Sequence, residues 1–211
     1  MPERTSSGNL IGVLISGRGS NLVAILDRID AGDLDARVAL VISNEPSAAG
    51  LAAARARGVP TLPLDHRRSA TREDHDREMA RALEAAGARL VCLAGYMRLL
   101  SGWFVDRFKG RILNIHPSLL PSFPGTCAQR QALESGVRIS GCTVHFVDEN
   151  VDSGPIVLQE AVPVLDGDTP ESLEKRILEA EHRVYSRAIS LYFSGGLRIS
   201  GRRVLGATPA V

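Results

Sequence analysis

The first half of the chain alternates short apolar runs with longer segments whose apolar residues recur at helical spacing. Predicted strands lie at residues 10–15, 38–42 and 90–94, with a short extended piece at residues 61–64. Predicted helices lie at residues 21–29, 48–57, 71–86 and 103–108. In the first of these helices, Leu22, Ile25, Leu26 and Ile29 fall on one face. Strands that alternate with helices predict a parallel sheet with helices on both faces.

The second half keeps the strands but places fewer helices between them. Predicted strands lie at residues 111–115, 142–147 and 156–162, and residues 197–199 and 203–205 are expected to form a terminal hairpin or edge strand. A short helix at residues 126–135 and a long helix capped by Thr169 complete the pattern. We therefore predict one α/β domain over residues 1–211, with a mostly parallel twisted sheet, helices on both faces, and loose termini at residues 1–8 and 207–211.

Composition and charge are those of an ordinary globular protein. The 211 residues are 44% hydrophobic and 23% charged, with a net charge of +1. This charge disfavours nucleic acid as a main partner, because a protein that neutralises several nucleic-acid phosphates normally carries a basic face. No apolar run approaches the length of a membrane span, and the first residues lack the apolar core of a signal peptide, so a cytoplasmic location is predicted. Cys92, Cys127 and Cys142 include no Cys-x-x-Cys pair and indicate reduced thiols.

Asn114 and His116 stand two residues apart at the end of an apolar run, directly before Pro117. Side chains at positions i and i+2 of a strand share a face, so an amide and an imidazole would project together beyond the strand end. Ligands of open α/β sheets bind outside the carboxyl ends of the strands, which makes this pair a candidate catalytic site. The alternative is a strand-end histidine that is bonded to a loop carbonyl.

A second candidate is the loop Ser-Gly-Arg-Gly-Ser-Asn at residues 16–21, which follows the first strand and opens a helix. Free backbone N–H groups and the helix dipole favour an anion at such a position, so the loop is a candidate phosphate site. The third glycine of a dinucleotide fingerprint and the Gly-Lys-Ser/Thr of a Walker loop are both missing. A tight turn with a purely structural purpose is the alternative.

Five segments of the chain together resemble the folate-dependent formyltransferases, in particular those that formylate glycinamide ribonucleotide. They lie at residues 14–21, 93–101, 113–125, 143–147 and 152–159. The third includes Leu-Asn-Ile-His-Pro-Ser-Leu-Leu-Pro, and the match spans nearly the whole chain in the family's order. The resemblance implies the formyltransferase fold and transfer of a formyl group from 10-formyltetrahydrofolate to the primary amine of N1-(5-phosphoribosyl)glycinamide in purine (IMP) biosynthesis.

The resemblance also implies the catalytic residues, which would be Asn114, His116 and Asp152. The amine would attack the formyl carbon directly, with Asn114 and protonated His116 donating hydrogen bonds to the oxyanion. A carboxylate beside the imidazole favours its protonated form. Asp152 would also hold the water that relays a proton to the leaving nitrogen, and no metal is needed.

The binding residues that the resemblance implies lie in both halves of the chain. The substrate phosphate would bind Gly19, Ser20 and Asn21, and its ribose Glu181. The folate co-substrate would contact Arg72, Asn114, Met97, Arg98, Leu99 and Leu100, the last four mainly through backbone groups. Some of these residues also have ordinary interpretations: Arg72 as a solvated arginine, Glu181 as an exposed helical carboxylate, and residues 97–100 as a packed loop.

The other four histidines are not expected to be catalytic, and one loop differs from the family's pattern. His66 and His75 are expected in solvent because their surroundings are charged, whereas His145 and His182 are expected at the wall of the site without a catalytic role. At residues 126–129 the chain has Thr-Cys-Ala-Gln where close relatives often carry histidines, so the substrate contacts of this loop stay open.

Two other functions are alternatives to the formylation of glycinamide ribonucleotide. Methionyl-tRNA formyltransferase shares the Asn-x-His core but carries an extra C-terminal domain, and the length and near-neutral charge of the chain disfavour it. A non-catalytic phosphate-binding module would use the glycine loop alone and would leave Asn114, His116 and Asp152 without a purpose. The predicted partners are therefore the two small-molecule substrates, without nucleic acid or membrane, and a homodimer is compatible with the sequence.

Overall fold

The computed structural model describes residues 8–207, which divide into two compact units. Unit 1 ends at Ile112 and unit 2 begins at Leu113. The predicted loose termini, residues 1–8 and 207–211, lie outside the described residues apart from Gly8 and Ala207. The extent of a single domain over residues 1–211 stays a prediction.

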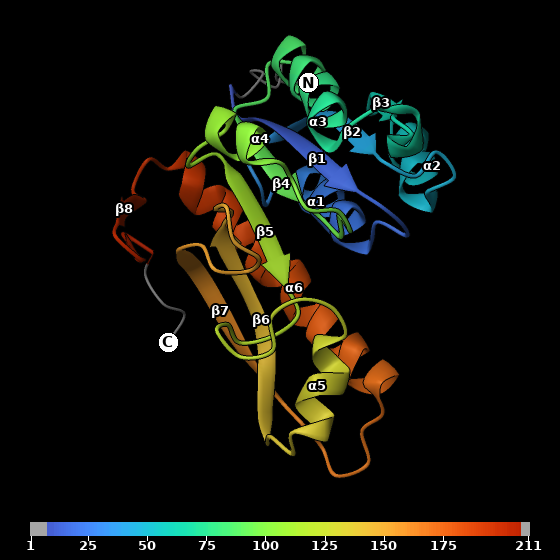
Figure 1. Ribbon diagram of the computed structural model, residues 1–211. Coiled ribbons are helices and arrows are strands. Elements are labelled where there is room, and N and C mark those ends of the chain that lie inside the picture. Colours follow the sequence, from blue (N-terminus) through green and yellow to red (C-terminus); the bar gives the residue numbers. More distant parts are fainter. Residues whose placement is uncertain (1–7, 208–211) are drawn as a thin grey trace. The chain divides into compact units, whose positions relative to one another are not determined.

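Unit 1 contains a parallel sheet in the order β3-β2-β1-β4 (Figure 1). Its strands are β1 (Leu10–Ile15), β2 (Arg37–Ser43), β3 (Thr61–Pro63) and β4 (Leu90–Leu93). The register pairs Val13 of β1 with Val41 of β2 on one side and with Cys92 of β4 on the other. β1 is therefore central and buried after its first residue, which explains its unbroken apolar run.

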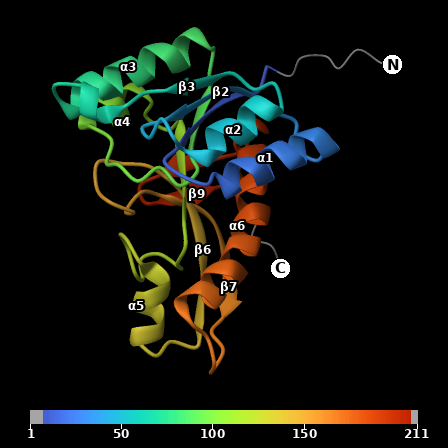
Figure 2. The same cartoon turned by 90° about the vertical axis from the view of Figure 1, so that its right-hand side faces the viewer.

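The helices of unit 1 cover both faces of this sheet. They are α1 (Ser20–Ala31), α2 (Ala49–Ala56), the short η1 (His66–Arg68), α3 (Arg72–Ala85) and α4 (Gly102–Arg107). The chain crosses from β1 to β3 in one direction and returns to β4, so right-handed crossovers place α1 and α2 on one face and α3 on the other. Figure 2 shows α3 and α4 on the side of the strands opposite to α1 and α2. The predicted parallel sheet with helices on both faces is confirmed for this unit.

Unit 2 is built on antiparallel strands, with the order β5-β6-β7-β9-β8. Its elements are β5 (Ile112–His116), α5 (Ala128–Glu134), β6 (Ile139–Phe146), β7 (Ile156–Pro163), α6 (Pro170–Phe193), β8 (Arg198–Ser200) and β9 (Arg203–Leu205). β6 pairs antiparallel with both β5 and β7, and no helix is needed between β6 and β7 because antiparallel neighbours can be joined by a loop. β8 and β9 form the predicted hairpin, and β9 pairs parallel with β7.

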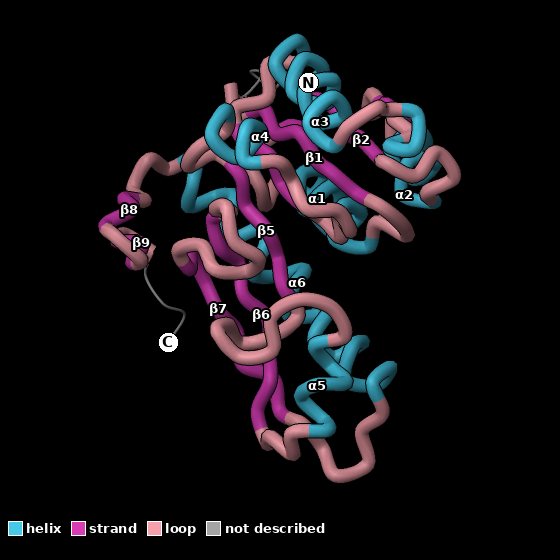
Figure 3. The backbone as a smooth tube through the Cα atoms, in the orientation of Figure 1, coloured by secondary structure: helices cyan, strands magenta, loops and turns pink. Residues whose placement is uncertain are grey.

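The long helix α6 packs against β6 and β7 (Figure 3). Thr169 and Ser172 form a capping box at its start, and Pro170 occupies the first helical position, where its missing N–H costs no hydrogen bond. The hydroxyl of the buried Tyr185 donates to the Leu113 carbonyl of β5 at 2.9 Å. α6 therefore also supports the strand that carries Asn114 and His116.

Helix α3 begins as predicted, since the Thr71 side chain accepts a hydrogen bond from the Asp74 N–H. The expectation that His75 lies in solvent is wrong, because its side chain is fully buried. His75, Met79 and Leu83 are four residues apart and share the buried face of α3. Most of the charged residues around His75 are exposed, but Asp76 is buried beside it.

Two further observations concern the cysteines and the apolar character of the helices. Cys92, Cys127 and Cys142 form no disulfide, in agreement with the predicted reduced thiols, and burial raises the pKa of Cys142 to about 12. Within residues 8–207, no helix combines the length and the apolar composition needed to cross a bilayer.

Candidate functional site

Asn114 and His116 lie on β5 with their neighbour His145 on β6. The antiparallel register places Asn114 directly opposite His145, and the Asn114 Nδ2 and His145 Nε2 atoms are 3.2 Å apart. Cross-strand pairs on one face of a sheet have side chains within reach of each other, so the two strands form a common wall. His145 therefore lies at the wall of the site, as predicted, but in closer contact with the catalytic candidates than the sequence indicated.

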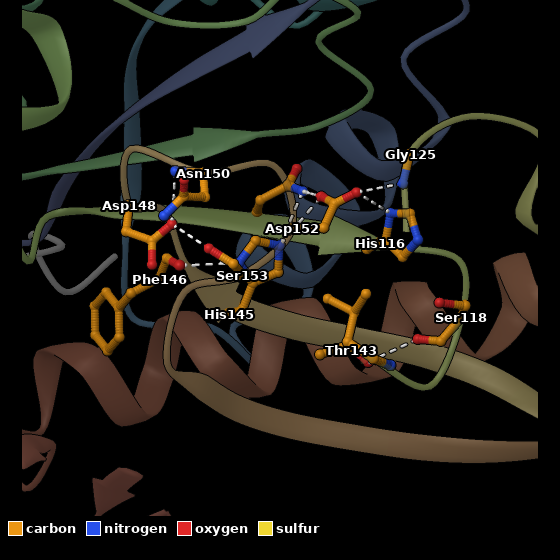
Figure 4. A network of polar contacts seen from close by, with 12 residues as sticks. His116, Ser118, Gly125, Thr143, His145, Phe146, Asp148, Asn150, Asp152 and Ser153 are labelled. Carbon is orange, nitrogen blue, oxygen red and sulfur yellow. Dashed lines mark hydrogen bonds and ion pairs between the residues drawn. The ribbon is translucent and has the colours of Figure 1, made fainter. Parts of the chain in front are cut away.

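The loop between β6 and β7 brings Asp152 to the same place. Asp148 accepts hydrogen bonds from the Asn150 N–H at 3.0 Å and from the Ser153 hydroxyl at 2.7 Å, which close a turn that includes Asp152. Asp152 itself has a φ of 50°, a left-handed conformation that few non-glycine residues adopt. The loop thus turns the Asp152 carboxylate back toward the strands (Figure 4).

The Asp152 carboxylate contacts all three side chains on the strands. Its Oδ2 atom lies 3.3 Å from His116 Nδ1, and its Oδ1 atom lies 3.5 Å from Asn114 Nδ2 and 3.7 Å from His145 Nε2. The Gly125 N–H donates to Oδ2 at 2.8 Å, and Figure 4 shows this bond beside the contact to His116. The predicted catalytic residues, up to 38 residues apart in sequence, thus form one cluster.

Asp152 is ionised in this cluster. Burial alone would raise its pKa, but hydrogen bonds from His145 and the Gly125 N–H, together with the charges of the neighbouring imidazoles, lower it below the ordinary value of 3.8. Opposite charges and hydrogen bonds to the charged form outweigh desolvation here. The cluster therefore contains a carboxylate at neutral pH.

Both ring nitrogens of His116 face hydrogen-bond acceptors. Nε2 lies 2.8 Å from the Phe123 carbonyl oxygen, which can only accept, and Nδ1 lies 3.3 Å from the Asp152 carboxylate. Both contacts are hydrogen bonds only when each ring nitrogen carries a proton. The loop-carbonyl bond that the sequence offered as an alternative is present, on the same side chain that contacts Asp152.

His145 makes contacts through both ring nitrogens. Its Nδ1 lies 2.9 Å from the Phe146 carbonyl oxygen, which can only accept a hydrogen bond. Its Nε2 lies 3.2 Å from the Asn114 amide and 3.7 Å from the Asp152 carboxylate. His145 is therefore placed to orient the amide of Asn114.

Side chains of β6 and β7 hold the loop that follows His116. Thr143 donates to the Ser118 carbonyl at 2.6 Å and accepts from the Leu120 N–H at 3.0 Å. Gln159 donates to the Leu120 carbonyl at 2.9 Å. Phe123, further along the loop, has a φ of 56° and presents its carbonyl to the imidazole. This loop is therefore held in place by β6 and β7, and its Phe123 carbonyl contacts His116 in the cluster.

The predicted phosphate residues lie in unit 1, at the start of α1. Gly19 has a φ of 75° and precedes the helix, and no acidic residue occupies the first turn. Ser20 and Asn21 are the first helical residues, where backbone N–H groups have no partner within the helix. An added Cβ at Gly19 would lie 2.9 Å from the Gly50 Cα of α2, so a close backbone approach requires glycine there.

The predicted folate residues also lie in unit 1. Met97, Arg98, Leu99 and Leu100 form an irregular segment between β4 and α4. The exposed fractions of Met97 and Leu99 are 72% and 55%, so the alternative of a packed loop does not fit these two side chains. Arg72 begins α3 and is exposed, which agrees with either of its interpretations.

Glu181 lies on α6 and is buried, so the alternative of an exposed helical carboxylate is wrong. It lies close enough to Cys142 of β6 to contribute, after burial, to the raised pKa of that thiol.

Thr126 and Cys127 directly precede α5 and are exposed, in the loop whose substrate contacts the sequence left open. Among residues 8–207, no group of three or more histidine, cysteine or acidic side chains is arranged to hold a metal ion.

Known proteins similar to this chain include formyltransferases. The formyl transferase family model matches residues 10–189. The phosphoribosylglycinamide formyltransferase of Escherichia coli is 43% identical over 187 residues, which cover 89% of this chain and 88% of that protein. The crystal structure of glycinamide ribonucleotide transformylase 1 from Symbiobacterium toebii is 56% identical, with a TM-score of 0.93 and coverage of 95% and 94%.

A longer relative matches over a part of its length. The trifunctional purine biosynthetic protein adenosine-3 of Drosophila melanogaster is 51% identical over 192 residues, which cover 90% of this chain. The chain spans only 14% of that relative. The similarity thus concerns one region of the trifunctional protein.

Proposed function

The chain belongs to the formyl transferase family, and we propose that it transfers the formyl group of 10-formyltetrahydrofolate to the primary amine of glycinamide ribonucleotide. The family and the α/β formyltransferase fold predicted from the sequence are confirmed. The names of the relatives support the predicted enzyme, which transfers formyl groups in purine biosynthesis. The clustering of Asn114, His116 and Asp152 in unit 2 is the observation that supports the catalytic assignment.

The reaction places three requirements on the protein. The substrate amine forms a bond to the formyl carbon, the carbonyl electron pair moves to oxygen, and the tetrahedral intermediate then breaks its bond to N10 of the folate. The amine loses a proton and N10 gains one. The protein must therefore stabilise an oxyanion, hold the reactants together and provide a path for one proton.

Asn114 and His116 supply the donors for the oxyanion in this proposal. In the structure, the Asn114 Nδ2 group contacts His145 and Asp152, and the His116 ring contacts Asp152 and the Phe123 carbonyl. Substrate oxygen would replace one acceptor at each donor, and the Phe123 carbonyl marks the position of an oxygen that His116 Nε2 can bind. Asp152 keeps His116 protonated and, with a bound water, provides the proton path.

The other predicted residues bind the two substrates in this proposal. Gly19, Ser20 and Asn21 hold the phosphate through backbone N–H groups at the start of α1. Met97, Arg98, Leu99 and Leu100 contact the pterin through backbone groups, together with Arg72 and Asn114, and Glu181 binds the ribose. The partners are small molecules, the location is cytoplasmic, and a homodimer is compatible with the proposal.

The experiment is a formyl-transfer assay with two acceptors and a control without acceptor. The protein is mixed with 10-formyltetrahydrofolate and either glycinamide ribonucleotide, methionyl-tRNA or buffer alone, and tetrahydrofolate release is followed together with the mass of the product. Formylated ribonucleotide as the main product is the expected result. Formylated methionyl-tRNA, formate release in buffer alone, or folate binding without turnover would each contradict the proposal in a different way.

A further inference from the structure

The proposed folate segment, residues 97–100, has no regular structure and exposes half of its side chains, so something outside the segment must hold its backbone. Two backbone N–H groups at its ends donate to side chains of other elements. The Met97 N–H donates to the Ser16 hydroxyl at 2.8 Å, and the Ser101 N–H donates to the Asp76 carboxylate at 2.6 Å. The segment is therefore attached at both ends to the body of unit 1.

At the first end, the attachment continues into the sheet. The Ser16 hydroxyl, just after β1, donates to the side chain of Asn44, which is buried at the end of β2. The Ser16 N–H donates to the Gly95 carbonyl at 3.0 Å. The start of the segment is thus fixed to the carboxyl ends of two neighbouring strands.

At the second end, the attachment is a single acidic side chain. Asp76 lies on the inner face of α3, and its exposed fraction is 1%. Burial raises its pKa, while hydrogen bonds from the Ser101 backbone and hydroxyl and the charges of Arg98 and Arg72 act in the opposite direction. A buried carboxylate is costly unless such partners are present, so its presence on a helix that could carry an apolar residue here calls for a purpose.

We propose that Asp76 is a positioning residue for folate, which holds the Ser101 end of residues 97–100 so that their backbone groups meet the pterin. This inference rests on the proposed function, because it takes the segment as the folate site. Two of the charged groups around the carboxylate, Arg98 and Arg72, are themselves predicted to contact folate. Asp76 thus connects the helix with the segment and lies within the influence of the charges of both arginines.

The test uses two pairs of variants that separate positioning from stability. Asp76→Ala removes the acceptor, and Asp76→Asn keeps an acceptor oxygen. Ser101→Pro removes the N–H donor at a residue whose φ of −71° suits proline. Ser101→Ala keeps the N–H, and both variants lose the hydroxyl that caps α4, so the two differ in the N–H donor. Each pair therefore contains one variant that loses the bond and one that retains it.

The expected result is selective for folate. Asp76→Ala and Ser101→Pro raise the KM for 10-formyltetrahydrofolate about tenfold, as expected for the loss of one charged hydrogen bond. Their KM for glycinamide ribonucleotide stays within about twofold of wild type, and Asp76→Asn and Ser101→Ala stay within about twofold for both substrates. The inference is overturned if both KM values rise together, if the folate KM does not change, or if the bond-breaking variants unfold at the assay temperature.

A binding measurement separates this inference from the proposed function. Trp103, the single tryptophan of the chain, lies two residues after Ser101 and reports on this region by its fluorescence. If wild-type protein transfers no formyl group, the proposed function fails, and the tetrahydrofolate Kd of the four variants then replaces the KM. A tenfold weaker Kd only in the bond-breaking variants supports the positioning role, and equal Kd values in all four overturn it.

Discussion

The predicted site residues of the two units differ in the groups they would offer to substrates, which are side chains in unit 2 and backbone groups in unit 1. In unit 2, the side chains of Asn114, His116 and Asp152 contact each other directly, and their protonation depends on those contacts. In unit 1, the candidate phosphate loop and residues 97–100 offer backbone groups, and the nearby side chains serve mainly to shape the backbone. Side-chain identity should therefore matter most in unit 2, and backbone conformation most in unit 1.

The largest effect is expected from the cluster in unit 2. His116→Ala or Asn114→Ala should lower kcat by about 10²–10³-fold, because each removes one donor to the oxyanion. The KM for glycinamide ribonucleotide should change little, which steady-state kinetics can measure. Asp166→Asn, a change of an exposed carboxylate in the same unit, is the control and should have wild-type kinetics. Loss of substrate binding with unchanged kcat would contradict the catalytic assignment.

A smaller effect is expected from the glycine loop in unit 1. Gly19→Ala introduces a side chain at a φ of 75° and within 2.9 Å of the Gly50 Cα, so unfolding free energy should fall by about 1–3 kcal/mol. The KM for glycinamide ribonucleotide should rise by about tenfold with a small change in kcat. Gly17→Ala is the matched control, because an added Cβ there meets nothing within 4 Å. Equal effects of the two substitutions would argue against a shaped phosphate cradle.

Acid should act on the two units in different pH ranges. The pKa of the buried His75 in unit 1 is lowered by burial, after which the charges of Arg98 and His66 act in the same direction, so its folded form favours the neutral ring. Its contribution to stability is complete above the unfolded pKa of 6.5 and is lost as pH falls below that value. Asp152 in unit 2 has a lowered pKa, so its contribution is complete above 3.8 and is lost as pH falls further.

Denaturant unfolding at several pH values can separate these two contributions. His75→Leu should reduce the loss of stability just below pH 6.5, whereas Asp152→Asn should reduce only the loss below pH 3.8. The wild-type curve measured in the same buffers is the reference. A His75→Leu variant with an unchanged slope below pH 6.5 would show that the buried imidazole does not contribute as argued.

The smallest effect on stability is expected at Met97. Its side chain is 72% exposed, so Met97→Ala should change the unfolding free energy by no more than about 0.5 kcal/mol. Because the proposed pterin contacts come from the backbone, kcat should also stay close to wild type. Thermal unfolding and the folate KM check both points. A large loss of turnover would show that the methionine side chain itself contacts the folate.

The sequence predicted what depends on local spacing and missed what depends on pairing between strands. The positions of Asn114 and His116 on one strand face follow from their spacing, but the link to Asp152 came only from the family resemblance. The contact of His145 with Asn114 requires the antiparallel register of β5 and β6, which no local pattern specifies. The predicted exposure of His75 was wrong because its neighbours in the sequence are charged, whereas its four-residue spacing from Met79 places both side chains on the buried face of α3.

The contact between Gly19 and Gly50 has a consequence for transplanting the loop into another protein. Gly50, in the first turn of α2, donates its N–H to the Gly17 carbonyl at 3.1 Å, and a Cβ on it would meet the Ile15 Cδ1 atom at 2.6 Å and the Gly19 Cα atom at 3.2 Å. Residue 50 is therefore part of the loop in space, although it lies about thirty positions away in sequence. A designer who grafts residues 16–21 onto another α/β scaffold must also supply a glycine-bearing helix start beside them, or the graft will not keep its shape.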